Sequence, residues 1–374
     1  MHDQANHHLG IGGATLRRQQ RERNERIRRD SAGSVWPDQA PILVEEPEEE
    51  DRSDPLVAVD EVMILDGEVE QSGGLLLETR VKVLTVEGLH DRTKRAIEAL
   101  VLLAATFSMG SPSGEVGRYT DETQHSVTIS RSFFMGQTEV TQGQWKALSG
   151  GTNPSWFQST TGTARSTANA NDSGPVEYLD WYAAVAFANA RSAAEGLTSC
   201  YTLTACADAT DGWKDGIHST CTGASFAGLT CTGYRLPTES EWEYAARGGT
   251  TGATYLGDLS GWVPDCSTAQ ANLDGIAWWC RNSGSRTNAV GGKTSNAFGL
   301  SDMLGNVWER TGDWSGTYPG TVTDPLGAGT GSGRVRRGGS WDYGARDVRA
   351  ATRDAGTPGN RYNSLGFRLA RTAP

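Results

Sequence analysis

Six cysteines are the residues of this chain best suited to metal or redox chemistry, and all lie between residues 200 and 280: Cys200, Cys206, Cys221, Cys231, Cys266 and Cys280. Their spacing lacks the paired Cys-x-x-Cys knuckles that hold structural zinc, so we predict no zinc site. An even number of cysteines in a loop-rich region instead predicts up to three disulfides, which form in an oxidising compartment.

The N-terminus does not identify that compartment. Its first residues, MHDQANHHLGIGG, contain no apolar stretch of the kind found in secretion signals. A cytoplasmic location is then the default, and the thiols would stay reduced there. A misassigned start or another export route would allow the disulfides, and the sequence leaves these alternatives open.

Histidine and serine patterns indicate no catalytic site. Three of the six histidines lie within the first eight residues, and the others, His90, His125 and His218, are isolated. They form no cluster of the kind that binds non-haem iron. Ser340 has no histidine in its own segment to activate it as a nucleophile. We therefore assign no catalytic residue.

Charge and hydropathy exclude two classes of partner. The formal net charge of −11 argues against a general nucleic-acid binder, which normally carries a basic surface. The longest apolar run, 96–107, is too short for a membrane span and contains Glu98. The 47 glycines and 12 tryptophans predict short elements, many specific turns and an irregular core.

The composition changes along the chain. Residues 1–55 carry the arginine-rich run 17–29 and the acidic run 45–54, which predict a disordered charged tail. Residues 56–104 read as a small β-rich segment or linker, and KRAIEALVLLAA (94–105) as either a short helix or the lead-in to a strand. From 105 to 374 we predict one folded domain, with strands in 107–111 and 125–141. Helices are predicted over 141–150, 180–196 and 238–249, from capping residues at their starts and glycines at their ends.

Five stretches of this domain resemble one family in sequence and in order: FFMGQTEVTQGQW, PVEYLDWYAAVAFAN, GYRLPTESEWEYAARGG, NAFGLSDMLGNVWER and RRGGSWDYGARDVRAATRD with NSLGFRLAR. They are similar to formylglycine-generating enzymes, also called sulfatase-modifying factors, over about 105–371. The resemblance implies an irregular α+β domain of the C-type-lectin-like class, with short strands, about three helices and much loop.

Most residues in these stretches have a structural interpretation. Glu241 would cap a helix, and Arg235 would form a buried ion pair beside it. Trp308 would lie in the core. The glycines of GGSW would supply positive φ angles. The arginines of the last segment would lock loops to carboxylates; they are Arg337, Arg349, Arg353 and Arg368.

The chemistry of the family is missing from the expected positions. In the family, two cysteines after the GGS turn bind copper for the oxidation of a substrate cysteine to formylglycine. The matching positions here hold Tyr343 and Val348, which cannot replace thiolates as ligands of soft Cu(I). We therefore expect no copper, and the balance of evidence favours a protein that is not an enzyme.

The resemblance also implies structural Ca²⁺, which binds six to eight oxygens. The ligands of one site would be Asp302, Gly305, Val307 and Glu309. A second site, from a looser match, would use Asn272, Leu273, Asn282 and Gly284. The alternative is that these carboxylates cap loops without a metal.

The C-terminal segment 334–371 resembles the variable region of ligand-binding family members that retroelements diversify. Tyrosine, serine, glycine and asparagine are typical of adaptable binding surfaces. The candidate ligand-binding residues are Trp341, Asp342, Tyr343, Arg346, Asp347, Asn360, Tyr362, Asn363 and Ser364. We expect Tyr343, Asp347, Tyr362 and Asn363 to face solvent together, above a buried Trp341 and Phe367. The alternative is that they are ordinary loop residues.

Three functional hypotheses remain from the sequence. The first is a non-catalytic module, with or without diversification, that binds a protein or a glycan through its C-terminal segment. The second is a metal-dependent oxidoreductase of the formylglycine-generating type. The third is an accessory partner of such a maturation system. The sequence does not indicate an oligomeric state.

Overall fold

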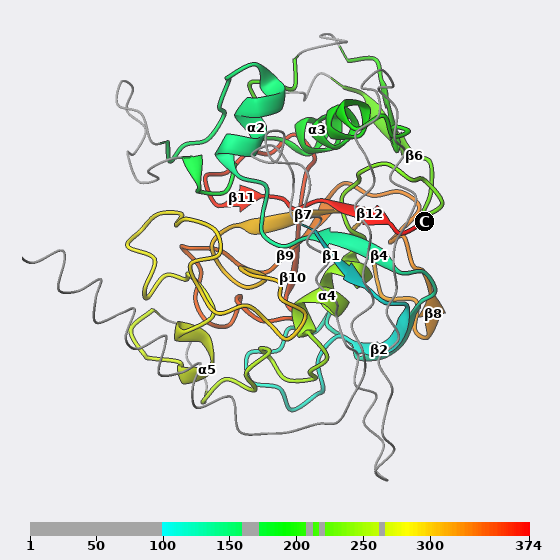
Figure 1. Cartoon of the computed structure of the whole chain (residues 1–374). Coiled ribbons are helices and arrows are strands. Elements are labelled where there is room, and N and C mark those ends of the chain that lie inside the picture. The colour runs from blue at the N-terminus through cyan, green and yellow to red at the C-terminus, as the bar shows by residue number, and fades with distance from the viewer. Residues whose placement is uncertain (1–98, 159–171, 207–211, 217–220, 262–265) are drawn as a thin grey trace, which may run out of the picture. The chain divides into compact units, whose positions relative to one another are not determined.

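A computed structural model describes residues 99–158, 172–206, 212–216, 221–261 and 266–374 (Figure 1). The expected tail 1–55 and residues 56–98 lie outside the described residues. Within these ranges the fold is α+β, with four helices, twelve short strands and much loop. None of these helices has the length and apolar character needed to cross a bilayer.

The three predicted helices form where their capping residues place them, and they are α2 (Gln142–Ser149), α3 (Trp181–Ala194) and α4 (Glu239–Arg247). Thr141 and Thr238 each close a capping box with the residue three positions later. Gly150 ends α2 in the left-handed region, with φ 74°. A short fourth helix, α5 (Ala271–Asp274), was not predicted.

Two sheets contain the C-terminal strands. In the first, β4 (Phe133–Gly136) lies between β1 (Ala99–Leu102) and β12 (Ala370–Thr372). In the second, the order is β10 (Arg353–Gly356), β9 (Arg334–Arg337), β7 (Trp308–Trp314) and β11 (Leu365–Gly366). For the described part of 94–105, the strand β1 decides between the two predicted alternatives in favour of a strand. It also shows that the sheet begins before residue 105, where we had placed the domain boundary.

The other two sheets are smaller. One contains β2 (Ala105–Met109), β3 (His125–Ile129) and β8 (Val322–Thr323), and the other pairs β5 (Tyr201–Thr204) with β6 (Gly223–Phe226). The strands predicted in 107–111 and 125–141 form as β2, β3 and β4, and β2 begins two residues earlier than predicted.

The C-terminal segment is built into the fold at several points. Its strand β9 pairs on both sides, with β7 and with β10. Its last strands pair with β7 and β4, as the red ribbons of Figure 1 show. Strands that are distant in sequence thus hold this segment, so it does not fray as many C-terminal tails do.

Two apolar clusters form the core. One surrounds α4 and contains Trp242, Trp279 and Leu300, all without exposed surface. The other packs against α3, where Trp145 stacks on Phe187 with ring centroids 5.1 Å apart. Tryptophan therefore fills the core between short elements, as the composition indicated.

All six cysteines form disulfides, which join Cys200 to Cys231, Cys206 to Cys221 and Cys266 to Cys280. The first two bridges tie together the region around β5 and β6. Three disulfides are compatible with an oxidising compartment.

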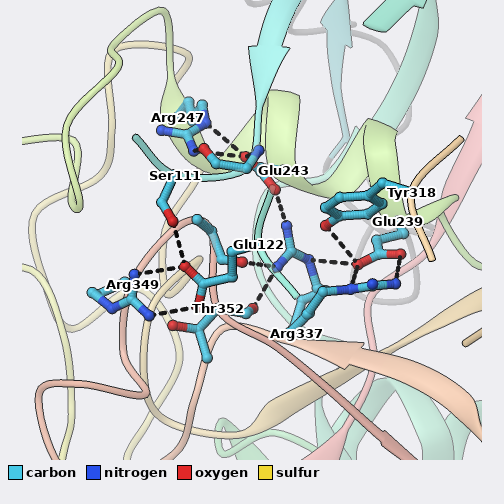
Figure 2. Close-up of polar contacts among 12 residues, drawn as sticks. Ser111, Glu122, Glu239, Glu243, Arg247, Tyr318, Arg337, Arg349 and Thr352 are labelled. Atoms are coloured by element: carbon cyan, nitrogen blue, oxygen red, sulfur yellow. Dashed lines mark hydrogen bonds and ion pairs between the residues drawn. The ribbon is translucent and has the colours of Figure 1, made fainter. Parts of the chain in front are cut away.

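Buried ion pairs attach the C-terminal segment to α4 (Figure 2). Arg337 pairs with Glu243 and lies 3.7 Å from a carboxylate oxygen of Glu239. Glu243 also binds Arg247 at 2.6 Å, and Glu239 binds Arg353 at 2.8 Å. Burial alone would raise the pKa of Glu243, but Arg247 and Arg337 together lower it. The carboxylates of Glu239 and Glu243 therefore balance the charges of Arg337, Arg247 and Arg353 inside the protein.

The other predicted arginine contacts are also present. Arg349 binds Glu122 and Glu115, each at 2.6 Å, and Arg368 binds Glu309 at 2.6 Å. The remaining predicted pair joins Arg235 to Glu241 at 2.6 Å. The expectation that arginines lock the last segment to carboxylates is confirmed.

Replacing Arg337 with Met should lower the free energy of unfolding by about 3–5 kcal/mol, because Glu239 and Glu243 stay buried without their shared cation. Urea denaturation at neutral pH measures the change. The control is Arg281→Gln, since Arg281 and Asp274 form a half-exposed pair at 3.6 Å, and its loss should cost less than about 1 kcal/mol. Equal losses in the two variants would contradict the central role of Arg337.

Candidate functional site

The candidate site begins at a turn that requires glycine. Gly338 and Gly339 follow β9 with φ angles of 96° and 74°. A Cβ on Gly339 would lie 2.7 Å from the side chain of Val348, and one on Gly338 would lie 3.0 Å from the carbonyl oxygen of Met303. Positive φ and close packing both demand glycine here. The turn brings the chain directly from β9 to the predicted binding residues.

An aromatic and cationic group follows this turn. Trp308 has 1% of its surface exposed, and the ring of Tyr343 packs edge-on against it at 5.3 Å. The guanidinium of Arg336 lies 5.5 Å from the Trp308 ring and 5.6 Å from the ring of Tyr362. Arg336 thus contacts both the Tyr362 ring and the Trp308 ring on which Tyr343 packs.

Polar groups surround these rings. Arg336 donates to Asp354 at 2.6 and 3.0 Å, and Asn360 donates to the hydroxyl of Tyr362 at 3.2 Å. Burial raises the pKa of Tyr343, and Arg336 partly offsets this shift. We call the set of Arg336, Asp342, Tyr343, Asp354, Asn360 and Tyr362 the C-terminal surface. Of its residues, Asp342 and Tyr362 are exposed, Tyr362 by 45%.

Other predicted binding residues have structural contacts instead. Asp347 accepts from the hydroxyl of Tyr119 at 2.7 Å, and Arg346 lies 3.7 Å from the Tyr119 ring and donates to the carbonyl of Gly117. Ser364 is buried, and its carbonyl accepts from the backbone of Trp308. Asp347 and Ser364 were expected on the surface. Instead, Asp347 is half-buried against the 115–122 loop, and Ser364 is buried beside the first residue of β7.

Of the two residues that we expected to be buried beneath the C-terminal surface, only one is. Phe367 is fully buried in the α3 cluster, which confirms that part of the prediction. Trp341 is half-buried, because its ring packs edge-on against Phe157 and its Nε1 donates to the carbonyl of Asn363, near the molecular surface. Asn363 is also half-buried. Trp308 takes the place under Tyr343 that we had assigned to Trp341.

The sequence reasoning missed Arg310, which lies under the C-terminal surface. Arg310 is 3% exposed and donates only to the carbonyls of Leu179 and Asn360, at 2.8 and 2.5 Å. It makes no ion pair with the residues described, and burial lowers its pKa to about 9 despite the attraction of Asp180. The sequence did contain a signal for it, because the GNVWER stretch ends in this arginine. A cation inside a buried strand is costly, so its presence there indicates a specific role.

The positions that match the copper ligands do not fit copper. Tyr343 packs its ring on Trp308, and the aliphatic side chain of Val348 is fully buried. Every cysteine of the chain is in a disulfide, so no thiolate is free to move into the site. The donor set therefore offers nothing to a soft Cu(I) ion.

The first predicted calcium site holds carboxylate oxygens without partners. Oδ1 of Asp302 and both carboxylate oxygens of Glu139 are buried and accept no hydrogen bond from the described residues. Burial raises the pKa of Glu139 well above its ordinary value, and the charge of Asp302 adds to the shift. Burial raises the pKa of Asp302 to about 6. A hard cation beside these two acids would supply the missing positive charge.

Glu139 was not among the predicted ligands, although it is a single acid in the apolar stretch FFMGQTEVT. Glu309, which was predicted, gives both its oxygens to Arg368, and Trp242 Nε1 also donates to it at 2.7 Å. Gly305 and Val307 are buried in the same turn. No three His, Cys, Asp or Glu side chains are grouped for metal binding in the described ranges, so a cation would need backbone or water oxygens as well.

The second predicted calcium site has less support. Asn282 donates to the carbonyls of Asp274 and Ala277 and accepts from the backbone of Trp279, which closes a loop. Asn272 donates instead to the carbonyl of Asp258. Leu273 is in the core, and Gly284 has a φ of 69°. The amides of Asn272 and Asn282 are thus directed at different backbone groups.

Residues 86–373 match the family described as the sulfatase-modifying factor enzyme 1-like domain. The chain belongs to this family. The formylglycine-generating enzyme of Streptomyces coelicolor is 41% identical over 150 residues, which cover 38% of this chain and 48% of that enzyme. The chaperone protein LppX of Paenibacillus barcinonensis is 32% identical over 246 residues, or 60% of this chain and 72% of that protein. The chain thus spans only about half the length of that enzyme.

Two solved structures share the fold of this family member. The Treponema denticola variable protein 1 is 32% identical with a TM-score of 0.62, over 75% of this chain and 98% of that one. PvdO of Pseudomonas aeruginosa is 23% identical with a TM-score of 0.56, over 75% and 96% of the two chains. The second likeness concerns the fold alone.

Tyr362→Ala should change the free energy of unfolding by less than about 0.5 kcal/mol, as is usual for exposed positions. Phe367→Ala should cost about 3–5 kcal/mol, because it empties a buried ring position. Tyr343→Ala should fall between the two, since Tyr343 is half-buried with its ring packed edge-on against Trp308. Guanidinium denaturation of the three variants measures the loss of unfolding free energy in each. A loss in Tyr362→Ala as large as that in Phe367→Ala would show that Tyr362 belongs to the core.

Proposed function

We propose that this family member is a non-catalytic binding protein that recognises a protein or glycan ligand through its C-terminal surface. The supporting observation is the group formed by Arg336, Tyr343 and Tyr362 over the buried Trp308. Tyrosine and arginine are the side chains that most often anchor protein interfaces. The rigid strands β7 and β9 hold these side chains in place, as a preorganised site requires.

The buried charge of Arg310 favours a ligand with an acidic group. Arg310 brings a positive charge with no carboxylate partner in the described part of the chain, directly beneath the loop that carries Asn360. Arg336 also lies within reach of the Tyr362 ring, but its charge is already balanced by Asp354. An acidic group on the ligand would compensate Arg310, whose charge is costly to bury unpaired.

Diversification of this segment is part of the proposal. The similarity to a protein named as a variable protein supports it, as does the placement of the exposed Asp342 and Tyr362 on a fixed base. Residues such as Asp347 and Ser364 hold structural contacts and would stay constant. Variation should therefore concentrate at Asp342 and Tyr362, which face solvent.

Arrays of glycans and displayed peptides, probed with the purified protein, test the binding proposal. The double variant Arg336→Gln/Tyr362→Ala should lose at least about tenfold in affinity for ligands that bind the unchanged protein, because two anchors are gone. Arg371→Gln, a half-exposed arginine on β12, is the matched control and should bind normally. Ligands that bind the double variant as tightly as the unchanged protein would reject the C-terminal surface as the site.

A cysteine-containing sulfatase peptide incubated with the protein, copper and oxygen should gain no formylglycine, because Tyr343 and Val348 cannot hold Cu(I). Mass spectrometry of the peptide measures the conversion. Formylglycine above the level of a copper-free reaction would favour the oxidoreductase hypothesis over the binding module.

We also propose that Ca²⁺ binds beside Asp302 and Glu139, completed by backbone oxygens near Gly305 and Val307. The unpartnered carboxylate oxygens support this position. The proposal leaves out the second predicted calcium site, because the side-chain amide of Asn282 is hydrogen-bonded within its own loop. The residues of that site are Asn272, Leu273, Asn282 and Gly284.

Ca²⁺ should raise the melting temperature, since a ligand at about 100 times its dissociation constant adds about 2.7 kcal/mol to the folded state. Glu139→Gln should abolish the difference between Ca²⁺ and chelator, because it removes one of the two free carboxylates. Asp324→Asn, which changes a carboxylate that bonds Ser130 at the surface, should keep the difference. Identical melting curves with Ca²⁺ and with chelator would reject the site.

A further inference from the structure

A cleft lies at the opposite end of β7 from the C-terminal surface. The strand runs seven residues from Trp308 to Trp314, so its ends are about 20 Å apart. The cleft has a volume of about 300 Å³ next to Trp314. Strands β5, β6 and β9, helix α3 and the loop after β7 contribute to its walls. Such a volume is at the lower end for small-molecule sites.

Arg334 is held flat in this cleft between two indole rings. Its guanidinium carbon lies 4.0 Å from the ring centre of Trp181 and 3.6 Å from that of Trp314. Its one hydrogen bond in the described part of the chain runs from Nη1 to the carbonyl of Gly312, at 2.5 Å. Nε is buried without an acceptor. The rings therefore fix the plane of the guanidinium while its other edge stays unbonded.

No carboxylate of the described residues pairs with Arg334, whereas Arg337, Arg349 and Arg368 all have such partners. Asp313 is nearby, but its Oδ2 accepts from the backbone of Glu239 at 2.7 Å. Burial raises the pKa of Asp313 well above its ordinary value. Burial also lowers the pKa of Arg334 to about 10. The cleft thus contains a partly desolvated cation that makes no ion pair with the described residues.

The remaining walls are apolar and aromatic. Tyr201 and Phe226 lie on one side with ring centroids 5.3 Å apart, and Leu326 stands at the rim with 48% of its surface exposed. A planar guanidinium beside such walls matches a carboxylate on an apolar or aromatic body. The unbonded edge of Arg334 would take the two oxygens, and the rings would cover the body.

We propose that this cleft binds small molecules or chain ends that carry a carboxylate on an aromatic or apolar group, with Arg334 as the anion-binding residue. The site is separate from the C-terminal surface and does not depend on the function proposed for it. Free aromatic acids and peptide C-termini share this chemistry, so the experiment compares both sources.

The test uses calorimetric titration of the full chain with 4-hydroxyphenylacetate and with a short peptide ending in phenylalanine. Each has its neutral amide as the matched probe. At least one carboxylate should bind about tenfold or more tightly than its amide, because only the carboxylate pairs with Arg334. The probe that binds more tightly shows whether the cleft prefers a free aromatic acid or a peptide C-terminus.

Two variants locate the binding. Leu326→Glu places a negative charge at the exposed rim and should weaken carboxylate binding by about tenfold or more. Leu103→Glu makes the same change at an equally exposed leucine, 46% exposed and away from the cleft, and should leave binding unchanged. Arg334→Lys keeps the charge but loses the planar fork, and should also weaken binding.

Three results would overturn the proposal. One is equal binding of the carboxylates and their amides. Another is the absence of saturable binding by either carboxylate up to about 10 mM, a concentration above the range of useful small-ligand affinity. The third is an equal effect of Leu326→Glu and Leu103→Glu, which would place any binding elsewhere.

Discussion

The buried pairing of Arg337 with Glu243 and Glu239 is the interaction on which the position of both candidate sites depends. It fixes the end of β9 to α4, and the Gly338–Gly339 turn that leads into the C-terminal surface begins at the next residue. Glu239 also binds Arg353 and donates its backbone N–H to Asp313 in the wall of the cleft. A shift of Arg337 would therefore move both ends of the second sheet.

Arginines in this protein fall into two groups with different consequences. Those paired with buried carboxylates, such as Arg349 and Arg368, join segments that are distant in sequence and have no capacity left for a ligand. Arg310 and Arg334 are desolvated, and among the described residues their hydrogen bonds go only to backbone carbonyls. Because an unpaired buried cation is costly, these two mark the places where an external anion has most to add.

The C-terminal surface combines side chains free to vary with side chains that support the fold. Tyr362 is exposed, but Tyr343 lies half-buried on Trp308, and Asp347 holds the hydroxyl of Tyr119. A substitution at Tyr343 or Asp347 would therefore alter packing as well as binding. Recognition on this fold is limited to the positions whose side chains leave the strands and loops toward solvent.

Local sequence alone determined three of the four described helices and the glycine turn, because caps and positive-φ glycines act within a few residues. The order of five motifs along the chain indicated the family. The sequence also indicated the arginine–carboxylate framework, although not which acid each arginine would meet. Only the tertiary structure decided that Trp308 rather than Trp341 supports Tyr343. It also decided that Glu309 is bound to Arg368, whereas the carboxylate of Glu139 accepts no hydrogen bond from the described residues. These outcomes depend on contacts between different motifs, such as that of Glu309 with Arg368 across 59 positions, and no spacing within one motif encodes such contacts.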